Sequence, residues 1–153
     1  MQSNIQSKNS HDVDQLNSFL RGELSAVETY DQALGKIDDT RLQTSLRDVR
    51  ESHDRRVDLL RQRIVQLGGE PASSSGIWGG FVKLIEGGAA AFGTSSAIAA
   101  LEEGEDHGRD DYRADLKELA PETRSFISTS ILPEQLRTHQ VMSSLKRQLK
   151  AAS

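Results

Sequence analysis

The stretch TRLQTSLRDVRESHDRRVDLLRQRIVQLGG, residues 40–69, decides the fold. Its apolar residues recur at the spacing of one face of an α-helix, and they are Leu42, Leu46, Val49, Val57, Leu60, Ile64 and Leu67. The Asp-Asp-Thr sequence at residues 38–40 supplies capping residues, and Gly68 with Gly69 stops a helix. The pattern therefore predicts one long amphipathic helix over residues 40–68.

The rest of the chain repeats this periodicity three times, which predicts further helices over residues 11–37, 95–119 and 121–151. Their apolar stripes are Leu16, Leu20, Val27, Leu34 and Ile37; Ile98, Leu101, Leu116 and Leu119; and Leu132, Leu136, Met142, Leu145 and Leu149. Pro121 suits a first helical turn, whereas Pro133 should kink the fourth helix or split off its first turns. Residues 1–10 are polar and are expected to form a flexible tail.

Two tight turns and one long connection set the expected topology. The turns near residues 38 and 120 make two antiparallel hairpins, and residues 69–94 connect them with a short helix expected near Trp78 to Glu86. Such a connection is long enough to cross the whole bundle. We therefore expect one all-α domain over residues 11–151, an antiparallel four-helix bundle of ferritin-like layout with a long crossover.

Composition excludes several classes of function. The formal charge of −4 and the pI near 5.6 argue against nonspecific nucleic-acid binding, which needs a basic face. Cysteine is absent, so thiolate metal sites and a cysteine nucleophile are excluded. No secretory signal and no membrane span are visible, which favours a cytoplasmic protein. No small-molecule substrate can be identified.

One ionisable residue interrupts each apolar stripe near its middle, namely Glu23, His53, Glu105 and His139. Glu23 and His53 are equidistant from Asp38, and Glu105 and His139 are equidistant from Glu122. Residues equidistant from the turn of an antiparallel hairpin stand at equal height. Because an unpaired carboxylate in a core costs several kcal/mol, these four residues are expected to meet in one buried cluster.

The two hairpins also share a local repeat. Gly22-Glu23 is followed seven residues after the glutamate by Tyr30, and Gly104-Glu105 is followed at the same interval by Tyr112. Seven residues make two helical turns, so each tyrosine lies on the face of its glutamate and can donate a hydrogen bond to a core carboxylate. The alternative is a simple core aromatic. The repeat indicates a duplicated helical hairpin.

This pattern of Gly-Glu and Tyr on two helices, with His on the other two, resembles the rubrerythrin branch of the ferritin-like superfamily. The Trp-Gly pair at residues 78–79 and the Glu-Glu-Gly-Glu stretch at residues 102–105 are similar to bacterial ferritin-like proteins described only as domains of unknown function. The resemblance implies a carboxylate-bridged di-iron or di-manganese centre, often with ferroxidase or peroxidase chemistry. It also implies a homodimer, for which Trp78, Phe81 and Phe92 are candidate contacts.

The ligand pattern departs from that family. Two-metal sites in such bundles use Glu-x-x-His on the second and fourth helices, but Arg50 and Leu136 stand three residues before His53 and His139. Glu102, three residues before Glu105, can add one ligand. Two carboxylates and two neutral imidazoles match one divalent ion in charge, so a mononuclear site for iron, manganese or zinc is favoured over two ions.

Two hypotheses about function remain open. The first is a buried Glu/His metal site for iron or manganese handling, or for weak oxidase activity in a stress response. The alternative is a metal-free structural or stress-response bundle in which each protonated histidine pairs with a glutamate. The arginine-rich run that includes Arg55, Arg56, Arg61 and Arg63 is expected to form a solvated face paired with acids one turn away.

Overall fold

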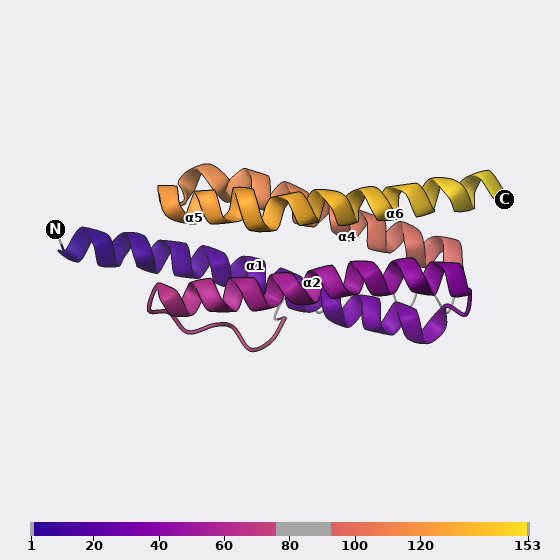
Figure 1. Ribbon diagram of the computed structural model, residues 1–153, viewed down its shortest axis with the longest axis horizontal. Helices are drawn as coiled ribbons and strands as arrows, with labels where there is room; N and C mark the ends of the chain where they lie inside the picture. Colours follow the sequence, from indigo (N-terminus) through magenta and orange to yellow (C-terminus); the bar gives the residue numbers. More distant parts are fainter. Residues whose placement is uncertain (1, 76–92, 153) are drawn as a thin grey trace.

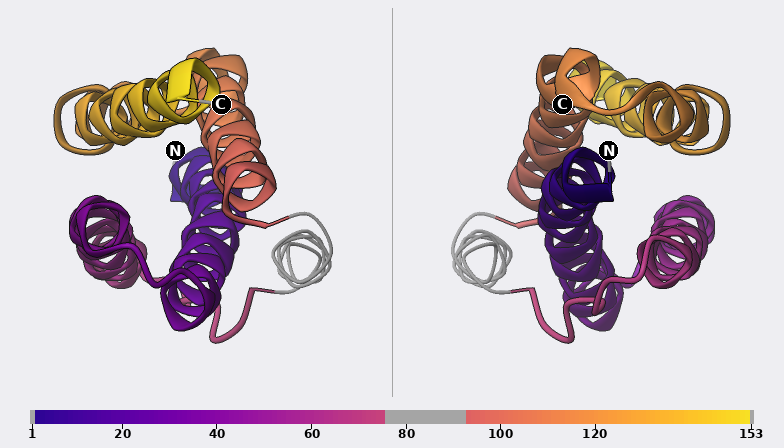
Figure 2. Two further views of the ribbon diagram at one scale, coloured as in Figure 1. Left: turned by 90° about the vertical axis from the view of Figure 1, so that its right-hand side faces the viewer. Right: turned by 90° about the vertical axis from the view of Figure 1, so that its left-hand side faces the viewer.

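The described part of the protein is entirely helical. The computed structural model describes residues 2–75 and 93–152, and these form helices without any strand. The long helices are α1 (Gln2–Lys36), α2 (Thr40–Gln66), α4 (Thr94–Asp115) and α6 (Leu132–Ala152). They lie side by side along the long axis of the molecule (Figure 1) and surround a common interior when viewed end on (Figure 2). The expected all-α class is therefore confirmed.

The helix bounds differ from expectation at two places. α1 begins at Gln2, so residues 2–10 continue this helix where a flexible tail was expected. α4 ends at Asp115 and is followed by the short 3-10 helix η2 (Leu116–Glu118). The short helix expected near Trp78 to Glu86 lies outside the described residues.

Capping interactions fix both ends of α2, as its sequence predicts. The side chain of Asp39 accepts a hydrogen bond from the backbone N–H of Leu42, at 3.0 Å. At the other end Gly68 has φ of 82°, and the N–H of Gly69 donates to the carbonyl of Ile64 at 2.9 Å. This is the geometry of a Schellman motif, in which glycine adopts the left-handed conformation at little cost.

Proline divides the fourth helical segment, again as predicted. The segment consists of α5 (Pro121–Phe126), the π-helix η3 (Ile127–Ile131) and α6. Pro133 has no N–H to donate to the carbonyl four residues earlier, and its ring clashes with that carbonyl. Just before the proline the helix forms one π-helical turn, in which the N–H of Leu132 donates to the carbonyl of Ile127, five residues earlier.

Helices α1 and α2 form one pair, and α4 and α6 form another. Asp31 of α1 contacts Arg50 of α2 at 2.9 Å, while Asn17 donates to the carbonyl of Glu70 at 3.0 Å. The order of these contacts shows that α1 and α2 run in opposite directions. Within the described ranges, no helix combines the length and the apolar character needed to cross a bilayer.

The apolar core has two halves. One surrounds the turn between α1 and α2 and includes Ile37, Leu46 and Ile98, and the other lies toward the opposite end and includes Leu16, Leu60 and Ile127. Between them, midway along the helices, buried polar side chains take the place of apolar ones. The bundle is therefore two hydrophobic clusters separated by one polar layer.

A buried charged layer as candidate functional site

Three of the four residues that interrupt the apolar stripes meet in the interior. Glu23 of α1, His53 of α2 and Glu105 of α4 are only 3%, 4% and 2% exposed. The imidazole ring lies between the two carboxylates, with Nδ1 at 2.5 Å from Glu23 Oε2 and Nε2 at 2.6 Å from Glu105 Oε1. These residues and the five described next (Tyr30, Arg56, Tyr112, Gln135 and Thr138) are called the buried layer below.

Both ring nitrogens of His53 face a carboxylate oxygen. An ionised carboxylate only accepts hydrogen bonds, so with both carboxylates ionised each nitrogen donates and the ring is an imidazolium. Burial and the nearby Arg56 lower the pKa of His53, but the charges of Glu105 and Glu23 raise it more, so that it lies above its ordinary value. The two carboxylates therefore favour the protonated form of His53 and hold its ring between them.

The two tyrosines donate to carboxylates, but each crosses to the other hairpin. Tyr30 Oη donates to Glu105 Oε1 at 2.7 Å, and Tyr112 Oη donates to Glu23 Oε1 at 2.6 Å. Both phenols are buried, and burial together with the facing carboxylate raises the pKa of each well above its ordinary value. These two hydrogen bonds connect α1 with α4, and the raised pKa values keep both phenols protonated.

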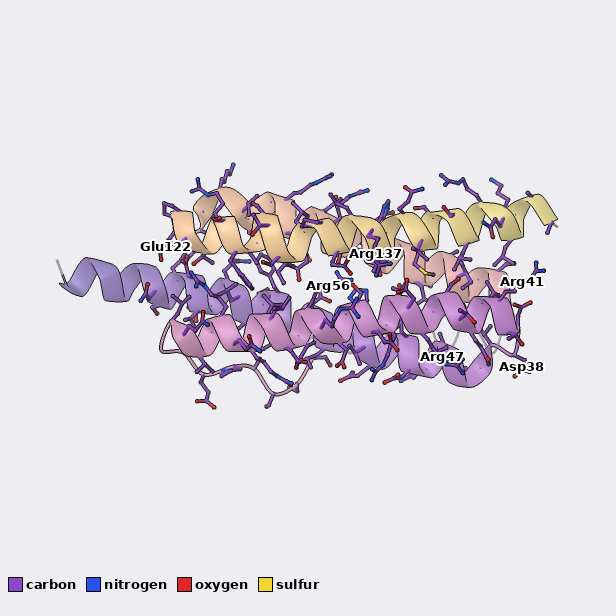
Figure 3. The ribbon with its side chains drawn as sticks, in the orientation of Figure 1. Asp38, Arg41, Arg47, Arg56, Glu122 and Arg137 are labelled. Atoms are coloured by element: carbon purple, nitrogen blue, oxygen red, sulfur yellow. The ribbon has the colours of Figure 1, made fainter. Side chains whose placement is uncertain are left out.

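Arg56 supplies a second cation to the layer, where a solvated face was expected. It is 1% exposed and reaches from α2 into the interior midway along the bundle (Figure 3). Nη1 donates to Glu23 Oε1 at 3.3 Å and to the side-chain oxygen of Gln135. Nη2 donates to Thr138 Oγ1 at 3.0 Å. Its position one turn after His53 points it inward, and these partners make its burial possible.

Helix α6 closes the layer with neutral side chains. The amide of Gln135 donates to Glu105 Oε2 at 3.0 Å, and Thr138 Oγ1 donates to the same oxygen at 2.9 Å. Gly108 of α4 makes room for this contact, because a Cβ added there would lie 2.9 Å from Gln135 Nε2. The small residue thus allows α6 to approach α4 closely.

The layer is electrically balanced and its hydrogen bonds are satisfied. Glu23 and Glu105 carry two negative charges, and His53 and Arg56 carry two positive ones. Burial raises the pKa of Glu105, but His53, Arg56 and Tyr30 overcome this and hold it at about 2. Burial likewise opposes ionisation of Glu23, yet Arg56 and His53 keep its pKa below the ordinary value. Each carboxylate oxygen accepts at least one hydrogen bond from a protein donor.

His139 and Glu102 lie outside this layer. His139 Nε2 is 2.5 Å from Asp106 Oδ1, and its side chain is 18% exposed. Glu102 forms an ion pair with Lys146 at 3.0 Å. Three of the four expected residues therefore meet, whereas His139 and the additional candidate ligand Glu102 are half-buried on α6 and α4, outside the layer.

The position of the second turn explains the displacement of His139. The equal-height argument took Glu122, beside the predicted turn, as its midpoint, whereas the helices change direction at Ala120, which separates η2 from α5. A turn that lies two residues earlier shifts the partner of Glu105 by four residues, about one helical turn. The residue at the height of Glu105 is consequently Gln135.

Sequence reasoning missed Arg56, Gln135 and Thr138, although the repeat contained a signal for the last two. Glu105 and Tyr112 follow Glu23 and Tyr30 by 82 residues. The same offset from His53 leads to Gln135, and from Arg56 it leads to Thr138. The offset therefore identifies the inward positions of the fourth helix without any assumption about where the turn lies.

A cavity of about 280 Å³ borders the layer between α1 and α4. Glu23, His53, Glu105 and both tyrosines line its inner wall, and Gly22 and Gly104 contribute surface without side chains. The carboxylates thus adjoin a space larger than a few water molecules.

In this arrangement the donors of the buried layer are engaged by one another. A metal-bound histidine offers a bare nitrogen to the ion, whereas each ring nitrogen of His53 faces a carboxylate oxygen. The Arg56 guanidinium beside Glu23 repels a second cation. In the part of the chain that the structure describes, one set of three His or carboxylate residues has all its ligand atoms within 4.8 Å, namely Glu102, Asp106 and His139. Glu23, His53 and Glu105 do not meet that distance.

Comparison with known proteins identifies one family. Residues 11–118 match a family described as a domain of unknown function (DUF2383). No curated protein and no solved structure gives a significant match. The match covers α1 from residue 11 onward, α2 and α4, and so includes Glu23, His53, Arg56 and Glu105.

Proposed function

The chain belongs to the DUF2383 family, whose description names no activity, and we propose that it is a metal-free helical bundle of ferritin-like layout with a structural role. In this proposal the protein's own cations, His53 and Arg56, hold the buried layer together. The single observation that carries it is the guanidinium of Arg56, 1% exposed, in hydrogen-bond contact with Glu23. Two carboxylates that already face two cations have no charge left to bind iron or manganese.

The ferritin-like layout is supported by contacts between the helix pairs. Tyr30 contacts Glu105, and Gln15, further toward the start of α1, contacts Asp115 at 2.8 Å. The order indicates that α1 and α4 run in opposite directions, so that α2 and α4 are parallel. A connection between parallel helices must cross the length of the bundle, as in a ferritin-like fold.

Thermal unfolding with and without chelator tests the proposal. A metal that binds only the folded state stabilises it by mass action, by about 2.7 kcal/mol at a hundredfold excess over its dissociation constant. We expect the melting temperature to be the same with a chelator and with added Fe²⁺, Mn²⁺ or Zn²⁺. Glu102→Gln with His139→Gln serves as the background, so that surface binding does not enter.

The variant His53→Ala separates the two hypotheses within the same experiment. In a metal-free layer it lowers the melting temperature equally with and without chelator, because Glu23 and Glu105 lose their shared partner. In a metal site the variant makes melting insensitive to chelator, whereas the parent protein is sensitive. A parent melting temperature that chelator lowers by several degrees, and that one of the ions restores, contradicts the proposal.

A second candidate function is the binding of one divalent ion by Glu102, Asp106 and His139. The close approach of their ligand atoms, all within 4.8 Å, favours it. Burial opposes ionisation of Asp106, but Glu102, His139 and Arg109 beside it lower its pKa. Lys146 pairs with Glu102 and Arg109 with Asp106, so an ion that binds here takes the place of these two cations. One imidazole and two carboxylates are ligands of the kind that Zn²⁺, Mn²⁺ and Fe²⁺ accept.

Calorimetric titration with Zn²⁺ tests this half-buried site on α4 and α6. We expect one ion per chain, and we expect His139→Gln to abolish binding while the matched change His107→Gln leaves it intact. His107 is a suitable control because its side chain on the same helix as Asp106 is 62% exposed. Equal zinc binding by the two variants contradicts the assignment.

Assembly into homodimers stays a prediction from the resemblance. The aromatic residues expected at the contact, Trp78, Phe81 and Phe92, lie outside the described residues. Light scattering coupled to size-exclusion chromatography measures the molar mass directly. A mass near twice 16.9 kDa is expected, and a mass of one chain contradicts it.

A further inference from the structure

The buried layer has an internal twofold repeat that includes more positions than the Gly-Glu and Tyr pattern seen in the sequence. Four pairs of residues are each separated by 82 positions: Glu23 and Glu105, Tyr30 and Tyr112, His53 and Gln135, Arg56 and Thr138. The contacts obey the same repeat, since Tyr30 donates to Glu105 while Tyr112 donates to Glu23. Each hairpin thus contributes the same four positions to one layer.

These positions have the arrangement of a two-metal ligand set. Two-metal carboxylate sites in helix bundles take one glutamate from each of two helices and a Glu-x-x-His pair from each of the other two, all projecting inward. Here Glu23 and Glu105 are the single glutamates. The inward pairs spaced by three residues are His53 with Arg56 on α2 and Gln135 with Thr138 on α6. Only these four side chains differ from the metal-binding pattern.

The side chains that replace the two Glu-x-x-His pairs leave the layer with no net charge in the absence of metal. Four carboxylates and two neutral imidazoles carry four negative charges, which balance two divalent ions. The present layer carries two negative charges, and His53 and Arg56 balance them from within the chain. On the α6 side, Gln135 and Thr138 keep hydrogen-bonding atoms at their positions but bring no charge. His53 and Arg56 therefore balance the whole charge of the two remaining carboxylates, and no charge is left for a metal ion to balance.

We infer that the buried layer is the ligand frame of a two-metal site in which His53 and Arg56 replace the charge of the two ions. This inference rests on the proposed metal-free function. According to this inference, the side chains of metal ligands fit at the inward positions of the layer without steric clashes. The adjoining cavity of about 280 Å³ leaves room beside the carboxylates for ions and a bridging water.

The direct test is to restore the ligands. The variant His53→Glu, Arg56→His, Gln135→Glu, Thr138→His has one glutamate or one Glu-x-x-His pair on every helix of the layer. We expect it to bind two Co²⁺ ions per chain, measured by titration of visible absorption and by elemental analysis after desalting. Glu102→Gln and His139→Gln are included throughout, so that surface ions do not contribute. The matched control carries the same changes together with Glu23→Gln and Glu105→Gln, and is expected to bind no Co²⁺.

Folding of the variant provides a second measurement. Without metal it carries four buried carboxylates and no internal cation, so it is expected to lose helix content. Circular dichroism followed during Co²⁺ addition should show helix returning as the second equivalent binds. A variant that stays unfolded with excess Co²⁺, or that binds no more Co²⁺ than its control, overturns the inference. Neither outcome affects the metal-free proposal, which depends only on the parent protein's response to metal and chelator.

Discussion

At Arg56 a guanidinium group is held inside the bundle by five hydrogen bonds to Glu23, Gln135, Thr138 and the backbone and hydroxyl of Ser52. Burying a charge is costly unless it is paired and its donors are satisfied, and here both conditions are met. The same contacts satisfy the acceptors of three helices. Arg56 therefore supplies one of the two positive charges that balance Glu23 and Glu105.

Replacing Arg56 by methionine is expected to lower the free energy of unfolding by about 3–5 kcal/mol, because it leaves Glu23 and Glu105 with only His53 as counter-ion. Urea denaturation followed by circular dichroism measures the change. The matched control is Arg55→Met, whose side chain is 59% exposed and makes only a 3.5 Å ion pair with Glu134. A loss of stability no larger than that of the control contradicts the role given to Arg56.

His53 gives the layer a dependence on pH whose sign is fixed by its raised pKa. Its contribution to stability is complete below its unfolded pKa, about 6.5, and is lost as pH rises through the folded value. The other ionisable groups that face it are Glu23 and Tyr30 of α1, Arg56 of α2, and Glu105 and Tyr112 of α4. Helix α6 adds only neutral Gln135 and Thr138.

We therefore expect the melting temperature to fall as pH is raised from about 6 to 9. The variant His53→Gln should be less stable at the low end of this range and should not show the decline. A metal site predicts the reverse, since protons compete with metal for the imidazole as pH falls. Stability of the parent protein that increases from pH 6 to 9 argues against an imidazolium at residue 53.

At the scale of elements, α5 shows how one helix is stabilised by another. Its first residues are preceded by Ala120, which has no side chain able to cap. Asp12 of α1 provides the cap instead, accepting from the N–H of Ala120 at 3.2 Å and from Thr123 Oγ1 at 2.6 Å. Since Asp12 is buried, this contact both starts α5 and holds α1 against the turn after η2.

Asp12→Ala should lower the free energy of unfolding by about 1–3 kcal/mol, because it leaves the buried hydroxyl of Thr123 without its acceptor and removes the cap. Chemical denaturation measures this loss. Asp14→Ala, a change at an exposed position two residues away, is the control and should be nearly neutral. If both substitutions lower the free energy of unfolding equally, the contact between Asp12 and α5 makes no specific contribution to stability.

Helix boundaries were predictable where a local signal defines them. Asp39, the two glycines at residues 68 and 69, and Pro133 act within a few residues of themselves, and the structure agrees with each. The turn near residue 120 was also predicted, but the equal-height argument used a midpoint at Glu122, two residues further along the chain. A displacement of that size was enough to exchange Gln135 for His139 as the partner of Glu105.

The same distinction applies to the candidate site. Glu23, His53 and Glu105 were predictable because each interrupts an apolar stripe. Arg56 was not, since a charged residue within an arginine-rich run is normally solvated, and only its partners on α1 and α6 make burial favourable. The crossing of the two tyrosines was also hidden, because it depends on how one hairpin packs against the other.

For the whole molecule, the polar layer divides the apolar core into two clusters of comparable size. Each cluster contains residues from both helix pairs, so hydrophobic burial joins the hairpins at both ends. The layer joins them in the middle through contacts with defined partners and directions. Hydrophobic packing thus supplies most of the stability, and the layer specifies how the two hairpins align.

The protonation state of His53 tests this account most directly. A long-range proton–nitrogen correlation spectrum of nitrogen-15-labelled protein distinguishes a doubly protonated ring from a neutral or metal-bound one, and comparison with His53→Gln assigns the signal. At about pH 7, where an ordinary histidine is largely neutral, we expect both nitrogens of His53 to carry protons, with no change on adding chelator or Zn²⁺. A ring with one bare nitrogen, or a signal that moves when Zn²⁺ is added, would contradict the claim that the chain's own cations hold the buried layer.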